Sequence, residues 1–312
     1  NTEIYVINSL STVINKNKIN KNLSTNKGGG IYVHESSPNI IDNIINNNSA
    51  GKGNTQDEHG GGIYIFRGYS ESPNGISNNK IDNNEASCGG GIYLSESSPE
   101  IKTNNIKNNT AMNDGGGISI MNNSSPNITN NNIITGNFAG QNGAGIYIKD
   151  SYGNFDNTIS SNVIEANEAS SAGGGFYILN SLPIIDNNTI GGGNLDKGNT
   201  ARWGGGICII SSESDKYSTI SNNHIKNNKA NSFGGGVFIN SHGVLLPDID
   251  RLDGWGDPDD EDYRENIPVK AGGDGELIPA SADEYEISGN VFQGNEHGDP
   301  LDYTEGAHVY FQ

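Results

Sequence analysis

The sequence is poor in cysteine, with only Cys88 and Cys208 among 312 residues. Two cysteines cannot form the disulfide framework that holds many small secreted domains together. They lie in copies of a repeat that are four windings apart, so at one strand spacing per winding they are separated by roughly 19 Å, beyond the reach of a disulfide. We therefore expect two free thiols that pack as small apolar side chains.

Apolar residues are also scarce. They make up 32% of the chain, whereas globular domains usually contain about 45–50%. Such a composition commonly indicates disorder. No apolar run is long enough to suggest a transmembrane helix, and no signal peptide is recognisable. Because the chain starts at Asn1, in the middle of a repeat, we expect a mature form or an excised piece of a longer protein.

Positive charge is limited and unevenly placed. The formal net charge is −19. Residues 241–312 contain 18 Asp and Glu against 3 Lys and Arg, a net of −15, which leaves −4 for the first 240 residues. No run of basic residues is present, so the sequence favours neither a nucleic-acid nor an anionic-lipid partner, and no membrane insertion is expected.

Order is predicted by repetition instead. A glycine-rich block of the form Gly-Gly-Gly-Ile-Tyr-Val begins at Gly28 and recurs at Gly60, Gly89, Gly115, Gly143, Gly173, Gly204 and Gly234. Successive copies of its first apolar residue are 26 to 32 residues apart. A repeat of that length is typical of a solenoid, and it suits one three-stranded coil with variable turns.

A second block, Ile-x-x-Asn-x-Ile-x-x-Asn-x-Ala, follows each first one and is undistorted over residues 101–111. Its first Asn recurs as Asn17, Asn43, Asn79, Asn104, Asn131, Asn162, Asn188, Asn223 and Asn290. Its second Asn recurs as Asn22, Asn48, Asn84, Asn109, Asn137, Asn167, Asn199, Asn228 and Asn295. Apolar residues every five positions fit neither an α-helix nor an alternating strand. They predict short strands separated by bends, with the Asn of each bend stacked on the Asn of the next coil.

These patterns predict an all-β chain: a single-stranded, right-handed parallel β-helix of about nine to ten coils over residues 1–312. Inward Ile, Val and Ala side chains would stack from coil to coil, and each coil would depend on its neighbours for stability. Residues 241–282 lack the repeat and are predicted to form one long acidic loop inserted between coils near the C-terminus.

The pairing of Gly-Gly-Gly-Ile with Ile-x-x-Asn resembles the GGAI and FxxN repeats of the polymorphic outer-membrane proteins, which are autotransporter adhesins. It is also similar to the parallel β-helix repeat of surface proteins and of polysaccharide lyases and hydrolases with the pectate-lyase-like fold. The resemblance implies an extracellular or cell-surface protein that binds polysaccharide or mediates adhesion. It does not imply one activity, because this fold carries many.

No catalytic signature of the enzymatic relatives is found, so catalytic residues stay unknown. A lyase of the pectate type needs a Lys or Arg base. The chain has four arginines, Arg67, Arg202, Arg251 and Arg264, and nothing in their surroundings marks one as a base.

The middle residue of each Ile-Tyr-Ile strand should point away from the core, because side chains alternate along a strand. This predicts an external stripe of Tyr5, Tyr32, Tyr64, Tyr93, Ser119, Tyr147, Tyr177, Cys208, Phe238 and Tyr310. The ligand-binding candidates among them are Tyr32, Tyr64, Tyr93, Tyr147, Tyr177 and Phe238. They could present a flat platform for sugar rings; alternatively, the aromatic column is purely structural.

The turn after this strand varies in length and carries charged residues, among them Glu35, Arg67, Glu96 and Asp150. The acidic insertion leaves from the same edge and would form one wall of a cleft, the best candidate for a site. Trp255 within the insertion is a further sugar-stacking candidate.

The insertion also contains a candidate calcium loop, with Asp248, Asp250, Asp253 and Asp257 as ligands. Closely spaced carboxylates before a glycine turn can supply the oxygens that calcium prefers. The spacing is one residue longer than in DxDxDG loops and the distal Glu is missing, so a solvated acidic loop is the alternative.

Three functions remain open from the sequence. The first is a polysaccharide-binding or adhesive surface module, assisted by calcium. The second is a polysaccharide lyase or glycoside hydrolase whose site lies between the 241–282 insertion and the adjacent β-helix face. The third is a structural stalk of a larger surface protein.

Overall fold

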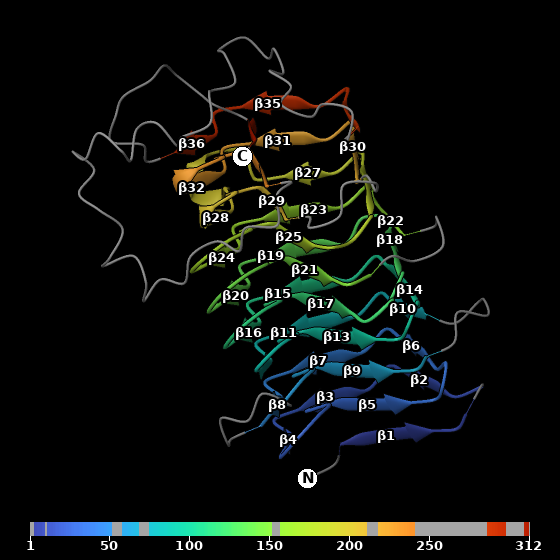
Figure 1. Cartoon of the computed structure of the whole chain (residues 1–312). Helices are drawn as coiled ribbons and strands as arrows, with labels where there is room; N and C mark the ends of the chain where they lie inside the picture. Colours follow the sequence, from blue (N-terminus) through green and yellow to red (C-terminus); the bar gives the residue numbers. More distant parts are fainter. Residues whose placement is uncertain are drawn as a thin grey trace.

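The computed structural model describes residues 3–9, 11–51, 58–68, 75–151, 157–210, 218–240, 286–297 and 309–311. The chain forms a right-handed parallel solenoid with four sheets, A to D, that run along its sides (Figure 1). The predicted fold class is confirmed. Coil 1 begins at the first strand of sheet A, and each later coil begins at the next strand of that sheet.

The strands have the following bounds. Sheet A contains β1 (Ile4–Ile7), β5 (Ile31–His34), β9 (Ile63–Phe66), β13 (Ile92–Ser95), β17 (Ile118–Met121), β21 (Ile146–Lys149), β25 (Phe176–Leu179), β29 (Ile207–Ile210), β33 (Val237–Asn240) and β37 (Val309–Phe311). Sheet B contains β2 (Val13–Asn15), β6 (Asn39–Ile41), β10 (Gly75–Ser77), β14 (Glu100–Lys102), β18 (Asn127–Thr129), β22 (Thr158–Ser160), β26 (Ile184–Asp186), β30 (Thr219–Ser221) and β34 (Glu286–Ser288).

Sheet C contains β3 (Lys18–Asn20), β7 (Ile44–Asn46), β11 (Lys80–Asp82), β15 (Asn105–Lys107), β19 (Ile133–Thr135), β23 (Val163–Glu165), β27 (Thr189–Ile190), β31 (His224–Lys226) and β35 (Val291–Gln293). Sheet D contains β4 (Leu23–Ser24), β8 (Ser49–Ala50), β12 (Glu85–Ala86), β16 (Thr110–Ala111), β20 (Phe138–Ala139), β24 (Glu168–Ala169), β28 (Thr200–Trp203), β32 (Lys229–Phe233) and β36 (Glu296–His297). A 3-10 turn, η1 (Leu195–Lys197), lies between β27 and β28. The expectation of three strands per coil was wrong, because the short Ala-containing segment pairs as a fourth strand.

The core consists of columns of aliphatic side chains. Strands pair in register, so that Ile101 lies beside Ile128 and Ile106 beside Ile134 on neighbouring coils. All four of these side chains are fully buried. Sheet D supplies smaller residues such as Ala111, also fully buried. Each coil thus packs mainly on copies of itself, which explains why an overall apolar content of 32% is sufficient.

The asparagine side chains close the bends between strands. The Oδ1 atom of Asn109 accepts hydrogen bonds from both the backbone N and the Nδ2 of Asn84, each at 3.0 Å. Its Nδ2 donates to the carbonyl of Ile81 at 3.0 Å and to Oδ1 of Asn137 at 3.1 Å. The side chain has no exposed surface. Each amide therefore satisfies backbone groups that the bend would otherwise bury unpaired.

One member of the predicted ladder was wrong. The backbone N and Nδ2 of Asn104 donate to Oδ1 of Asn132, at 2.9 and 3.1 Å, and not to Asn131. The bend after β18 contains an extra residue, since Asn130 and Asn131 both adopt positive φ where the equivalent bend after β14 has Thr103 alone. The ladder itself is continuous across this insertion.

The glycine triplets are required by close approach as well as by conformation. Gly89 has a φ of +64°, which disfavours residues with a Cβ. A Cβ on Gly90 would lie 2.5 Å from the carbonyl oxygen of Thr110, and one on Gly91 would lie 2.6 Å from that of Gly117. Neighbouring coils therefore touch through their backbones at this corner.

Replacing a ladder amide should weaken the fold strongly. In Asn109→Ala, several buried backbone and amide groups lose their partner at once, and each such loss costs about 1–3 kcal/mol. We expect a destabilisation of roughly 3 kcal/mol or more, measured as a shift of the urea unfolding midpoint followed by circular dichroism. The exposed neighbour Asn108, with a φ of +53°, offers the control: Asn108→Gly should change stability by less than about 0.5 kcal/mol. Equal shifts for the two variants would contradict the role of the ladder.

Candidate functional site

The edge between sheets A and B is the most variable part of the solenoid. In coil 2 the chain crosses it with a short turn, whereas four other crossings include residues 69–74, 152–156, 211–217 and 241–285, which lie outside the described residues. The predicted acidic insertion is one of them, since it connects β33 in sheet A to β34 in sheet B. A rigid scaffold with long connections gathered at one edge is a common arrangement for a binding site.

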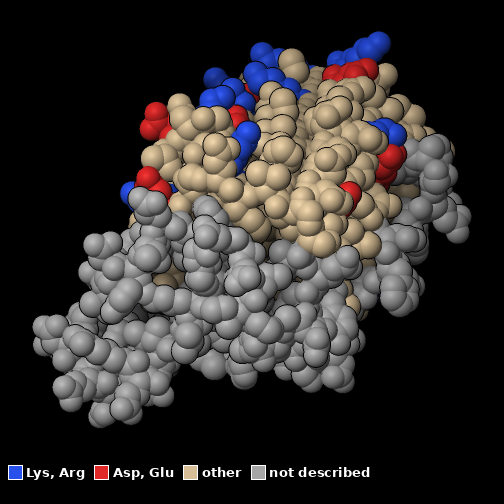
Figure 2. Space-filling model, turned by 90° about the horizontal axis from the view of Figure 1, so that it is seen from above, with Lys and Arg blue, Asp and Glu red and all other residues tan. Residues whose placement is uncertain are grey.

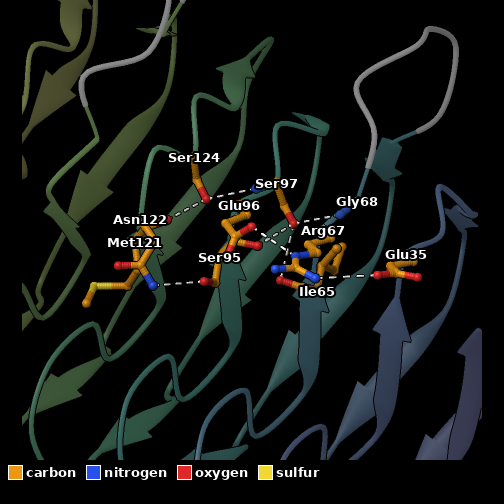
Figure 3. A network of polar contacts seen from close by, with 10 residues as sticks. All are labelled: Glu35, Ile65, Arg67, Gly68, Ser95, Glu96, Ser97, Met121, Asn122 and Ser124. Atoms are coloured by element: carbon orange, nitrogen blue, oxygen red, sulfur yellow. Dashed lines mark hydrogen bonds and ion pairs between the residues drawn. The ribbon is translucent and has the colours of Figure 1, made fainter.

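Three charged side chains form a row along this edge (Figure 3). An Arg67 Nη1 atom lies 3.5 Å from a carboxylate oxygen of Glu35, and Nε lies 3.0 Å from one of Glu96. The three residues come from consecutive coils and share one repeat position, the first residue after a sheet A strand, with positive φ values of 48°, 54° and 50° in chain order. We call Glu35, Arg67 and Glu96 the charged row.

The charged row is partly solvated, with side-chain exposures of 35% for Glu35, 49% for Arg67 and 46% for Glu96. The hydrogen bond to Glu96 raises the pKa of the Arg67 guanidinium above its usual value. An arginine that acts as a base must lose its proton, which requires a lowered pKa. The two carboxylates therefore hold Arg67 in its charged form.

The turns next to the charged row are held by serine side chains (Figure 3). The hydroxyl of Ser97 accepts from the backbone N of Gly68 at 2.9 Å and donates to the carbonyl of Ser95 at 2.8 Å. The backbone N of Ser97 in turn donates to the hydroxyl of Ser124 at 3.0 Å. These bonds tie successive coils together, so the charged side chains project from a fixed backbone.

Aromatic rings lie beside the charged row in coils 1 to 3. Tyr5 is 56% exposed, and its ring centroid lies 5.3 Å from that of Tyr32. In the next outward-facing column, His34 stacks on Phe66 at 5.3 Å, and the Arg67 guanidinium lies 4.8 Å from the Phe66 ring centroid. We call Tyr5, Tyr32, His34 and Phe66 the aromatic corner.

Beyond coil 2, the predicted exposed tyrosine platform is wrong. Tyr64, Tyr93, Tyr147 and Tyr177 are only 4–6% exposed, and Phe238 is fully buried. Their tyrosine rings stack in pairs, Tyr64 on Tyr93 at 5.4 Å and Tyr147 on Tyr177 at 5.3 Å. The rings point away from the core, but they are too buried to stack on a sugar.

For two of these rings, part of the cover comes from an aromatic residue that precedes a glycine triplet. His59 stacks on Tyr93 at 4.4 Å, and Trp203 lies 5.6 Å from Phe238. In both pairs the covering residue lies at the end of a coil, two coils before the ring that it contacts. Side-chain alternation predicted the direction of the rings correctly but could not show this second layer of packing.

The remaining predicted site residues were not placed. Trp255 and the candidate calcium ligands Asp248, Asp250, Asp253 and Asp257 lie outside the described residues. Within the described ranges, no group of three or more His, Cys, Asp or Glu side chains could hold a metal ion. The part of the chain that the structure describes also contains no helix long and apolar enough to cross a membrane.

The charged row was missed as a unit by the sequence analysis, although its residues were noted one by one. The signal that could have found it is the position in the repeat. Glu35, Arg67 and Glu96 each follow the first apolar residue of their strand by four positions, so opposite charges alternate on three consecutive coils.

A comparison with protein families agrees with this geometry. The family described as a right handed beta helix region matches residues 1–105 and 51–216. The chain belongs to this right handed beta helix family. No curated protein and no solved structure matches the chain. Membership of the beta helix family establishes the fold and leaves the ligand to be argued from the surface.

Both cysteines of this beta helix protein are free thiols, as expected. Burial raises the pKa of the Cys88 thiol to about 11 and also raises the pKa of the fully buried Cys208. Because the thiolate is the reactive form, we expect iodoacetamide at neutral to mildly alkaline pH to modify Cys88 on the order of a hundredfold more slowly than a free cysteine. Mass spectrometry after timed quenching measures the rate. Cys88 should react faster as the pH approaches 11, and both thiols should react fully in denaturant; rapid labelling of the native chain would contradict the described packing.

Proposed function

We propose that the chain is an extracellular or cell-surface β-helix module that binds polysaccharide at the edge between sheets A and B. The observation that carries the proposal is the juxtaposition of the aromatic corner with the charged row on one rigid edge. Sugars are commonly bound by aromatic rings that contact their apolar faces together with charged side chains that bind their hydroxyls.

The two groups would have different roles. Tyr32 has Tyr5 on one side and Tyr64 on the other, both at 5.3 Å, so its ring faces are largely covered. Tyr5 is the terminal ring of the described column and offers the most exposed surface. We expect a sugar residue to stack on Tyr5, and the hydroxyl groups of the polymer to bond with Glu35 and Glu96.

The polymer would lie along the edge, because the charged row spans three coils at a spacing of about 4.8 Å per coil. Adhesion to a surface polysaccharide, assisted by calcium in the acidic insertion, belongs to the same proposal. The insertion of residues 241–285, with 13 Asp and Glu against 3 Lys and Arg, begins and ends at this edge and has the composition for such a role.

A glycan array, run with and without calcium, tests the proposal. The wild-type chain should be retained on a subset of polysaccharides, and the double variant Glu35→Gln/Glu96→Gln should lose at least about tenfold in affinity, since a hydrogen bond to a charged group contributes about 1.5–3 kcal/mol. Tyr5→Ala should weaken retention on the same polymers. Each spot is also scored for new unsaturated or reducing ends.

The matched control is Glu85→Gln/Glu168→Gln, which changes the net charge equally at two exposed positions of sheet D. It should bind like the wild type. Equal losses in the two double variants would show that only overall charge matters and would reject the proposed edge. Cleavage of the retained polymer would show that the chain is an enzyme and would reject its assignment as a binding module.

A further inference from the structure

The lysines of this acidic chain gather on one side of the solenoid. Figure 2, a view along the axis, shows the blue Lys and Arg side chains concentrated along its upper side, with few red side chains between them. Sheet C and the bends that flank it contribute Lys16, Lys18, Lys21, Lys80 and Lys107, all within coils 1 to 4. Three of these lysines belong to coil 1 and two to coils 3 and 4, so winding brings together residues that are up to 91 positions apart.

Most of this charge is not neutralised locally. Within the described residues, Lys16, Lys18, Lys21 and Lys107 form no ion pair, whereas Lys80 lies 3.4 Å from Asp82. One further carboxylate, Asp42, lies in the bend beside Asn43 on coil 2. With five lysines and these two aspartates, the region has a net charge of +3, in a chain whose total is −19.

Exposed aliphatic side chains lie among the lysines. Ile44 is 41% exposed and is paired in register with Lys18 on one side and Lys80 on the other. Ile133, 42% exposed, lies in the same column further along the sheet. Lysines that surround exposed aliphatic groups combine electrostatic attraction with apolar contact, as in proteins that bind at a membrane interface.

We propose that this face, with Lys16, Lys18, Lys21, Lys80 and Lys107 around Ile44, binds the surface of an anionic lipid bilayer. The lysines extend across the whole width of sheet C, from one bend to the other, and over four coils, so they define a plane and not a line. A planar anionic surface can meet all of them together, whereas a single linear polyanion would meet only one row. The exposed Ile44 adds an apolar contact that a lipid interface accommodates and a soluble polyanion does not.

The negative charge of the chain does not oppose this contact strongly. Sheet C lies behind sheet A, across the core (Figure 1). The carboxylates of the charged row are therefore on the other side of the solenoid, and salt screens charges beyond a Debye length of about 8 Å at physiological ionic strength. Binding through sheet C would leave the edge between sheets A and B facing away from the membrane.

The test is co-sedimentation of the full chain with vesicles of phosphatidylcholine containing roughly 30 mol% phosphatidylserine, at low and high salt, beside vesicles of phosphatidylcholine alone. We expect binding to the anionic vesicles at low salt and much weaker binding to the neutral ones. Each lysine near such a surface contributes about fivefold in partition, so Lys18→Gln/Lys107→Gln should lower partition about twenty-five-fold. Ile44→Ser should lower it by several fold and leave the salt dependence unchanged.

The matched control is Lys149→Gln/Lys229→Gln, which removes two lysines, one from sheet A and one from sheet D, that form no ion pair within the described residues. It should bind like the wild type, and circular dichroism should show all variants folded. Equal binding to neutral vesicles, equal loss in the control, or tighter binding to soluble polygalacturonate or duplex DNA than to the vesicles would overturn the proposal. The glycan array does not depend on these lysines, so either proposal can fail alone.

Discussion

The whole structure depends on the hydrogen-bonded asparagine amide. A solenoid with corners must bend its backbone once per strand, and each bend buries peptide groups that cannot join a sheet. At each of the two bends that flank sheet C, one amide accepts from the coil before it and donates to the coil after it, as Asn109 does with Asn84 and Asn137. The ladder therefore both satisfies the bend and fixes the register of neighbouring coils, while the isoleucine columns supply most of the apolar burial.

A scaffold fixed in this way tolerates variation where the ladder is absent. The bends at both ends of sheet C carry the amides, and most have two residues; the exceptions are the extra residue at Asn130 and Asn131 and the longer connection 191–199, which contains η1. The crossing from sheet A to sheet B has serine hydroxyls in place of the amides, and its length varies from the short turn of coil 2 to the segment 241–285. The candidate site thus lies at a corner, between sheets A and B, that the asparagine ladder does not constrain.

Sequence repetition was sufficient to predict the fold, the free cysteines and nearly every ladder residue, because a one-dimensional repeat maps directly onto stacked coils. It was insufficient for contacts that join different repeat positions. The burial of Tyr93 under His59 joins positions that no periodic pattern relates. The charged row and the lysine face were missed for a related reason, since it becomes clear that Lys18 and Lys107 lie on one face only when the register of each coil is known.

The two faces also show why the total charge of a solenoid is a poor guide to its partners. A net charge of −19 argues against an anionic partner only if the charges act from one place, as in a small compact domain. Here the sheets form different sides of the solenoid and keep its charged surfaces apart. Because salt screens charges beyond about 8 Å, these surfaces act nearly independently. Sheet C can thus be locally positive while the opposite edge carries Glu35 and Glu96. Each side of a β-helix is best treated as a separate surface with its own ligand chemistry.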